Sequence, residues 1–229
     1  ICLSVGHGFK APTLKQISPG YQEDEGPATF FGNAALRPES NNAAELGIGW
    51  DTPAAGATLM AFHNRVRDLI VPRLFGVQGP RAQYVFENID RAVLRGWEAA
   101  ASMRLGGGFA AALNYQYLDA RDGAGSRLEN RPRHTVGASL DWRGGAWRGG
   151  LRVEHNAGQM LASATVGQPP QPVPGLTFVG LDGGVELGHG VELRAGVSNL
   201  GQVSLADKSP LFTYAETPRT WRLSLRGHW

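Results

Sequence analysis

The sequence predicts an all-β fold, an antiparallel transmembrane β-barrel meander. Three observations support this prediction. Ten segments alternate apolar residues with polar or small ones, which is the period of a strand with one buried face. Short and long connections alternate strictly between these segments, and aromatic residues gather near the strand ends. Both features are typical of outer-membrane barrels, which have short periplasmic turns, long extracellular loops and aromatic girdles.

The ten segments follow one another along the whole chain. The first puts Ile1, Leu3 and Val5 on one face, with small residues between them. The fifth puts Phe109 and Leu113 in register in the same way. No segment has the 3.6-residue period of a convincing helix. The expected strands are residues 1–9, 42–51, 57–70, 94–105, 108–119, 134–142, 147–155, 177–187, 191–200 and 220–229.

The connections carry as much information as the strands. Four links are tight and read TPAAG, GGG, RGGA and GHG. The other five are long and hold most of the proline; they run over 10–41, 71–92, 119–133, 157–175 and 201–220. Long structureless loops are uncommon inside a compact soluble domain. A soluble β-sandwich interaction module nevertheless stays open as the alternative fold.

Composition excludes several classes of protein. No run of about 18 apolar residues is present, so the sequence predicts no transmembrane helix. The mean hydropathy of -0.23 is compatible with a barrel wall, in which only alternate residues face lipid. Of 22 basic residues 19 are arginine, but they are dispersed, which argues against nucleic acid as a partner. The single cysteine, Cys2, excludes an internal disulfide.

No catalytic constellation stands out. The six histidines lack the spacing of a metal site. The glycine-rich stretches LGGGF and DGAGS lack the lysine and helix that follow a phosphate-binding loop, so they indicate turns. We therefore expect a protein that is not an enzyme and holds neither a metal nor a covalently bound cofactor.

Charged residues concentrate on one face of the expected strands. A charge that faces lipid at the middle of a membrane costs roughly 2–4 kcal/mol. We therefore expect these side chains to line an enclosed interior. The set comprises Glu45, Glu98, Arg148, Arg152, Glu154, Glu192, Arg194, Arg222 and Arg226.

A series of motifs resembles the TonB-dependent outer-membrane receptor family. The stretch GHGFKAPTLKQ resembles the G-F-K/R-A-P motif, and GNAALRPESNNAAELGIGW resembles the stretch that follows it. FHNRVRDLI, ENIDRAVLRGWEAA, LNYQYLDARD, LENRPRHTVGASLDW, LRAGVSNLGQ and ETPRTWRLSLRGHW continue the series in the family's order. The likeness covers almost the whole chain and is greatest to the catecholate-siderophore and colicin-receptor branch.

The resemblance implies a plugged barrel of about 22 strands. Residues 1–229 would be its C-terminal part, with the last ten strands, and the plug and earlier strands would lie outside this chain. The terminal aromatic residue, Trp229, would be the assembly signal, where the family usually has Phe. The expected location is the bacterial outer membrane, as a multi-pass barrel.

The function that the resemblance implies is active transport. The receptor would bind a ferric siderophore at its extracellular loops and import it with energy coupled through TonB. A passive porin-like barrel and a haem receptor are the alternatives, although no histidine stands between Pro12 and Leu36, where haem receptors of this superfamily carry one. Expected partners are the siderophore, the TonB complex, outer-membrane lipid and lipopolysaccharide, and also colicin-like toxins or phages.

Arginine and aromatic residues in the long links are the candidate ligand contacts. Such a surface suits a flat anionic iron complex through stacking and charge, and loops that pack on one another are an equally open interpretation. In the third link, contacts to an anionic chelate compete with loop salt bridges to Asp119, Asp122 and Glu129 and with lipopolysaccharide phosphates. The candidates are Tyr21, Phe30, Phe31, Arg37, Arg73, Phe75, Arg81, Tyr84, Arg127 and Arg131, with Arg121 and Arg133 beside the last two.

Overall fold

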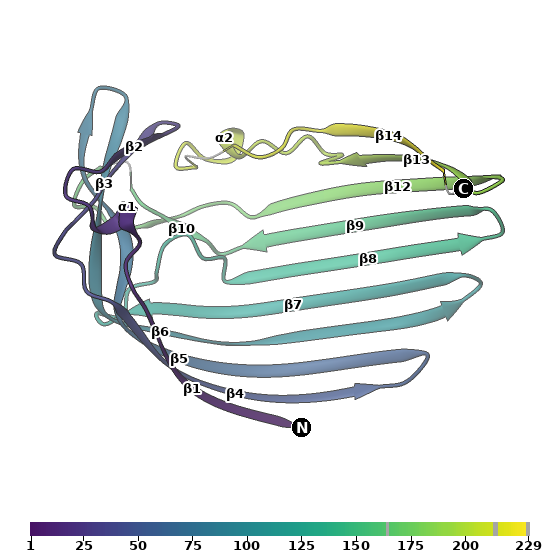
Figure 1. Cartoon of the computed structure of the whole chain (residues 1–229), viewed down its shortest axis with the longest axis horizontal. Coiled ribbons are helices and arrows are strands. Elements are labelled where there is room, and N and C mark those ends of the chain that lie inside the picture. The colour runs from purple at the N-terminus through teal and green to yellow at the C-terminus, as the bar shows by residue number, and fades with distance from the viewer. Residues whose placement is uncertain (164, 213–214, 228–229) are drawn as a thin grey trace.

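The computed structural model describes residues 1–163, 165–212 and 215–227 and forms one large antiparallel sheet (Figure 1). All ten predicted segments are strands, and each pairs with the next along the chain. In sheet order they are β1 (Cys2–Lys10), β4 (Glu39–Asp51), β5 (Ala55–Gln78), β6 (Arg81–Gly106), β7 (Phe109–Asp122), β8 (His134–Gly144), β9 (Trp147–Ala157), β12 (Leu176–Gly188), β13 (Val191–Ser198) and β14 (Thr220–Gly227).

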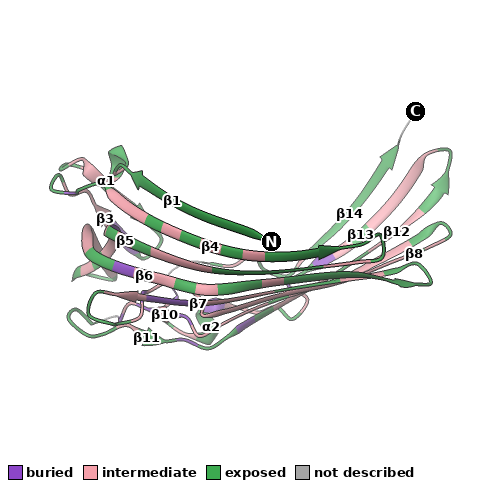
Figure 2. Cartoon of the chain, turned by 90° about the horizontal axis from the view of Figure 1, so that it is seen from below, coloured by how far each residue is buried: buried purple, intermediate pink, exposed green. Residues whose placement is uncertain are grey.

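The sheet is an open trough rather than a closed cylinder. Figure 2 shows it curved, with β1 and β14 as its two rims. The tight turns gather at one end of the trough and the long links at the other, as predicted (Figure 1). Backbone groups in lipid must be paired, so a sheet that spans a membrane has to close. Both edge strands therefore need a partner strand in the membrane.

The prediction of a long loop over residues 71–92 is wrong, because these residues form strands. Strands β5 and β6 continue through this stretch as one long hairpin, paired from Val71 and Glu87 to Gln78 and Arg81. Beyond Arg67, β5 pairs only with β6. An edge strand tolerates proline, so Pro72 does not end it, although proline and glycine here resemble loop signals in the sequence.

The first and the last two long links contain short elements that the sequence did not predict. In the first, β2 (Gln22–Glu25) pairs with β3 (Ala28–Phe31), which lies parallel to β6. Two helices of one turn, α1 (Leu14–Ile17) and α2 (Leu205–Lys208), begin at capping residues Thr13 and Ser204. The two-residue strands β10 (Met160–Leu161) and β11 (Gln171–Pro172) pair with each other. No helix in the described residues is long and apolar enough to cross a membrane.

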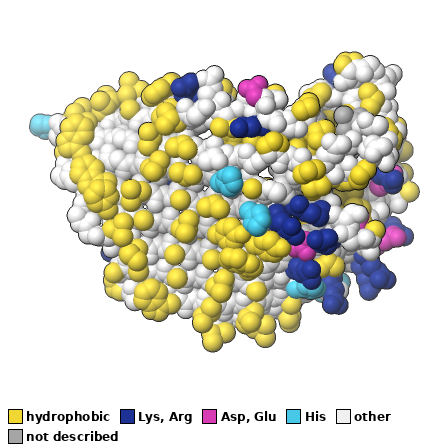
Figure 3. All heavy atoms as spheres, turned by 180° about the vertical axis from the view of Figure 1, so that it is seen from behind, with side chains coloured by type: hydrophobic (Ala, Val, Ile, Leu, Met, Phe, Trp, Pro, Cys, Tyr) yellow, Lys and Arg dark blue, Asp and Glu magenta, His cyan; other side chains and the backbone are white. Residues whose placement is uncertain are grey.

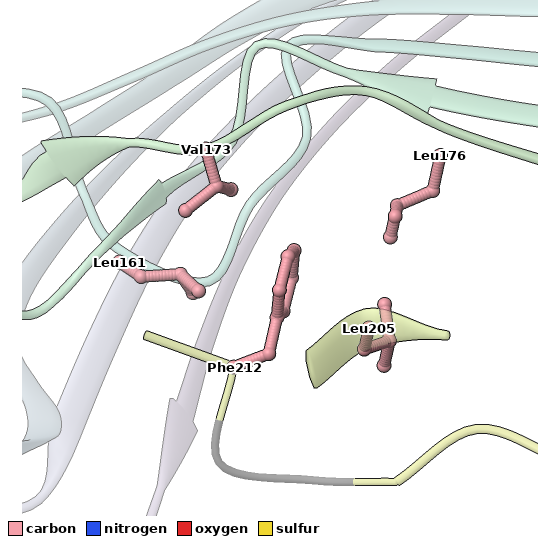
Figure 4. Packing of buried hydrophobic residues seen from close by; sticks show 5 residues of the cluster. All are labelled: Leu161, Val173, Leu176, Leu205 and Phe212. Atoms are coloured by element: carbon pink, nitrogen blue, oxygen red, sulfur yellow. The ribbon is translucent and has the colours of Figure 1, made fainter. Parts of the chain in front are cut away.

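A small hydrophobic cluster holds the last two long links together. Figure 4 shows Phe212 between Leu161 and Val173 on one side and α2 on the other. Each of these side chains is buried, unlike most of the wall. The loops therefore have a core of their own, made of Leu161, Val173, Leu176, Leu205 and Phe212.

The convex face of the trough is apolar and exposed. Residues paired across antiparallel strands share a face, and the register joins Trp50, Leu113 and Val153 in one such row. Trp50 is 58% exposed and Leu113 is 52% exposed. Figure 3 shows hydrophobic side chains spread over this face. No second sheet covers it in the described chain, so the sandwich alternative is wrong and the apolar belt is a surface for lipid.

The two faces of β7 give a direct test of this assignment. Leu113 lies midway between Phe109 and Tyr117 on the convex face, and Asn114 points to the other side. We expect Leu113→Arg to lower the free energy of unfolding in a bilayer by roughly 2–4 kcal/mol, because the charge would face hydrocarbon. Urea titration of the full-length protein in lipid vesicles measures this. Asn114→Arg is the matched control, and an equal loss in both variants would contradict the assignment.

Candidate ligand-binding surface

Three aromatic side chains meet at the loop end of the trough and are called the aromatic group here: Phe30, Tyr84 and Phe86. Phe30 stacks on Tyr84 with ring centroids 5.3 Å apart and also on Phe86 at 6.1 Å. Phe31 and Phe75 form a separate edge-on pair at 5.5 Å, which the strand registers put on the other face of β3 and β6. The parallel pairing of β3 with β6 brings these residues together, although Phe30 and Tyr84 are far apart in the sequence. Sequence reasoning missed Phe86, which lies on the unforeseen hairpin.

The candidate arginines near the aromatic group are held by carboxylates. Arg37 pairs with Asp68 at 2.6 Å between nitrogen and oxygen. Arg73 pairs with Glu87 at 3.0 Å, yet its side chain stays 71% exposed. A third pair joins Arg81 to Asp24 at 3.3 Å. The Arg37 and Arg81 pairs link the first long loop to the β5/β6 hairpin, whereas the Arg73 pair lies within the hairpin. The loops therefore pack on one another and still present guanidinium groups to solvent.

Tyr21 lies apart from the aromatic group. Its hydroxyl donates to the Glu23 carboxylate, which also accepts from Lys15 at 2.8 Å. The Lys15 ammonium group lies 5.7 Å from the centre of the Tyr21 ring. Hydrogen bonds from Lys15 and Tyr21 hold the pKa of Glu23 below its ordinary value. This local set orders the start of the loop and brings Tyr21 to none of the other candidate aromatics.

The loop after β7 sends neighbouring residues to different surroundings. Leu128 is buried against Leu69, Ala92 and Ala120. Burial lowers the pKa of the Arg131 guanidinium. Burial, and secondarily the Glu129 carboxylate, raises the pKa of Tyr84, so this loop lies close to the aromatic group.

Arg127 takes a different position. A backbone bridge joins it to Arg121, and its guanidinium donates to the Gly158 carbonyl. The two candidate arginines of this loop therefore differ in their surroundings: Arg131 donates to the Glu129 carbonyl, whereas Arg127 lies beside Arg121 and Arg133.

Two asparagines fasten the first loop to the hairpin. Asn88 accepts a hydrogen bond from the Arg37 backbone N–H at 2.8 Å and donates to the carbonyls of Arg37 and Asp68. Asn33 donates to the Phe86 carbonyl at 2.9 Å. These bonds fix the height of the first loop beside the aromatic group. Nothing in the sequence pattern marks Asn88 for this role, because the contact spans 51 positions.

The charged residues expected to line the interior share the concave face. Arg152 pairs with Asp141 at 2.7 Å, and Glu192 pairs with both Arg148 and Arg194. They border a groove of about 680 Å³ that runs along β9, β12, β13 and β14. The strand registers put the whole predicted set on this one face: Glu45, Glu98, Arg148, Arg152, Glu154, Glu192, Arg194, Arg222 and Arg226.

Two further expectations concern groups outside this surface. Trp229, the expected assembly signal, lies outside the described residues. Within those residues, no three His, Cys, Asp or Glu side chains form a group that could hold a metal ion.

An open antiparallel wall with an apolar convex face, a charged concave face and packed loops at one end defines part of an outer-membrane receptor barrel. The sequence model of the TonB dependent receptor-like β-barrel matches residues 3–200. The chain therefore belongs to this family of outer-membrane receptors, which are not enzymes. The predicted family, fold class and location are confirmed.

Two related outer-membrane proteins and one solved structure align with nearly all of this chain. An iron-regulated outer membrane virulence protein of Vibrio cholerae is 27% identical over 240 residues, which are 96% of this chain and 36% of that protein. A ferric enterobactin receptor of Pseudomonas aeruginosa is 27% identical over 265 residues, covering 96% and 35% respectively. A crystal structure of a mutant of that bacterium's ferric enterobactin receptor, PfeA, matches with a TM-score of 0.72 at 25% identity, over 97% of this chain and 37% of that one. The chain thus spans about a third of the length of these relatives.

Replacing Asn88 tests whether it fastens the first loop. We expect Asn88→Ala to raise hydrogen exchange of amides 18–37 about tenfold, because the loop loses two of its hydrogen bonds to the hairpin, each worth roughly 0.5–1.5 kcal/mol. Hydrogen-exchange mass spectrometry of the full-length protein measures this. Gln78→Ala is the control, since that side chain is exposed and is hydrogen bonded to Gln83 within the hairpin. Unchanged exchange in Asn88→Ala would show that other contacts hold the loop.

Proposed function

We propose that this chain is the C-terminal barrel part of a receptor that binds a ferric siderophore at its extracellular end and imports it with energy coupled through TonB. Membership of the receptor family and the names of two relatives, a ferric enterobactin receptor and an iron-regulated outer-membrane protein, support the proposal. The transported ligand is the iron complex, and the protein performs no chemistry on it.

The observation on which the proposal depends most is the aromatic group with its arginines. A ferric catecholate complex is flat at its aromatic rings and negatively charged. Stacked rings such as Phe30 and Tyr84 suit the catechols, and guanidinium groups suit the charge. Arg131 lies on the loop that approaches Tyr84 and is the candidate for the closest charge contact.

The concave face fits the same function. In this proposal the charged set, including Arg148 and Arg194, meets a plug that closes the barrel, supplied by a part of the receptor outside this chain. Ion pairs such as Arg152 with Asp141 already neutralise part of that face. Arg222 and Arg226 of β14 form no ion pair among the described residues, so this edge of the face favours an acidic plug surface.

Growth under iron limitation tests the ligand and the energy source together. A strain that lacks its own receptors and carries the full-length protein is supplied with single sources: ferric enterobactin, other siderophores, haem or cobalamin. We expect growth on a ferric catecholate, and none when TonB is deleted. Growth on that source without TonB would indicate a passive porin-like barrel. Growth on haem alone would make the protein a haem receptor.

Substitution within the surface tests where the ligand binds. We expect Tyr84→Ala combined with Arg131→Ala to weaken ferric catecholate binding at least tenfold, because one stacking contact and one charge contact are lost. Quenching of tryptophan fluorescence in the purified full-length receptor measures the Kd. Lys208→Ala is the matched control, a single exposed charge on α2 without an ion pair among the described residues. An unchanged Kd in the double variant would move the site elsewhere.

A further inference from the structure

The convex face carries a dense arginine patch just beyond the apolar belt at the loop end. Figure 3 shows basic side chains gathered there beside the hydrophobic surface. The registers put Arg65 and Arg67 of β5 on this face with Arg91 and Arg95 of β6. The members are called the arginine patch: Arg65, Arg67, Arg91, Arg95, Arg121, Arg127 and Arg133.

A single carboxylate, that of Asp119, organises three arginines of the patch. Asp119 is buried and pairs with Arg95 at 3.2 Å, Arg121 at 3.0 Å and Arg133 at 3.2 Å. Three guanidinium groups around one carboxylate leave a net charge of +2 on this cluster. Asp119 therefore fixes the directions of its arginines without neutralising them.

Two other arginines of the patch, Arg67 and Arg91, are not paired with a carboxylate among the described residues. Arg67 and Arg91 lie directly opposite each other in the β5/β6 ladder. Like charges at such a position destabilise a strand pair. Within the part of the chain that the structure describes, neither residue forms an ion pair, and both side chains are exposed. An anion between them would relieve this repulsion.

Aromatic residues fix the depth of the patch in the membrane. Trp97 follows Arg95 by two residues on the same face and meets Tyr115 at 4.8 Å. The Tyr115 hydroxyl is hydrogen bonded to Nδ1 of His134 at 2.7 Å. Such aromatic residues lie at the membrane interface. The patch begins at Arg95, two residues from Trp97 toward the loop end of β6. This distance is roughly 7 Å along the strand and puts the patch at the level of the lipid head groups.

Strand length agrees with this depth. The eight steps from Phe109 to Tyr117 span roughly 27 Å along β7, or roughly 20 Å across the membrane at a strand tilt of about 40°. The apolar band of an outer-membrane barrel is about 25 Å tall. The arginines lie beyond that band, on its extracellular side, because the long links mark that end.

We propose that the arginine patch is a binding site for the phosphorylated sugar head group of lipopolysaccharide in the outer leaflet. Guanidinium groups bind phosphate in bidentate fashion. Seven arginines with one carboxylate on a lipid-adjacent surface match a head group that carries two phosphates. The acyl chains of the same lipid then lie on the apolar belt directly below.

Lipid titration of the complete receptor tests this site. Detergent-purified, delipidated receptor is titrated with bisphosphoryl lipid A, dephosphorylated lipid A or phosphatidylglycerol, and bound lipid is counted by native mass spectrometry. We expect bisphosphoryl lipid A to bind at least tenfold more tightly than the other two. We expect Arg67→Gln combined with Arg91→Gln to weaken that binding by about tenfold or more, since each arginine near an anionic surface contributes about 1 kcal/mol.

Matched variants separate a site from general charge. Arg104→Gln combined with Arg143→Gln removes the same charge from exposed positions at the opposite end of the trough and should leave binding unchanged. Arg67→Lys combined with Arg91→Lys should recover part of the binding. Equal binding of the two glutamine variants, or equal binding of bisphosphoryl lipid A and phosphatidylglycerol, would overturn the proposal. This test measures lipid binding and not siderophore uptake, so its result does not depend on the result of the transport test.

Discussion

The whole structure depends on the pairing of backbone groups between neighbouring strands. In hydrocarbon an unpaired N–H or C=O costs several kcal/mol, so the chain can cross only as a sheet that leaves no edge in lipid. That pairing fixes the side-chain period at two and divides every strand between two solvents. The apolar residues of the wall are consequently exposed to lipid, and no large side chain is fully buried among the described residues. Packed clusters form only in and beside the loops, as at Leu205 and Leu128.

This constraint explains what the sequence predicts well. Alternation of apolar and polar residues follows from the two faces, so all ten strands and the tight turns between them are readable from composition and spacing. Beyond the membrane the constraint lapses. Residues 71–92 need not alternate toward lipid, and their strand conformation depends on cross-strand packing of residues such as Phe75 and on freedom from a second neighbour. Proline and glycine therefore predicted a loop over these residues, which form strands instead.

The candidate site was predictable by residue type but not by arrangement. Aromatic and arginine residues in the long links are visible in the sequence, whereas their grouping depends on register. Arg95 joins Arg121 and Arg133 only because β6 and β7 pair as they do. Arg127 and Arg131 are four residues apart in one loop, yet Arg127 donates to the Gly158 carbonyl and Arg131 to that of Glu129. Asn88 fixes the first loop by accepting one hydrogen bond and donating two, and Asp119 orients its arginines as an acceptor. The sequence pattern indicates neither role.

The β5/β6 ladder also shows how one hairpin serves two surfaces. Arg67 and Arg91 pair on the convex side, and the residues beside them, Asp68 and Asp90, lie where the pairing is interrupted and Asp68 has a φ of 55°. Both aspartates contact Arg37 of the first loop. Neighbouring positions of the hairpin thus hold a lipid-facing pair of arginines and a pair of aspartates that bind the first loop. A change in the pair of arginines leaves the ion pairs of the aspartates in place, so lipid contact and loop position are separable within a single hairpin.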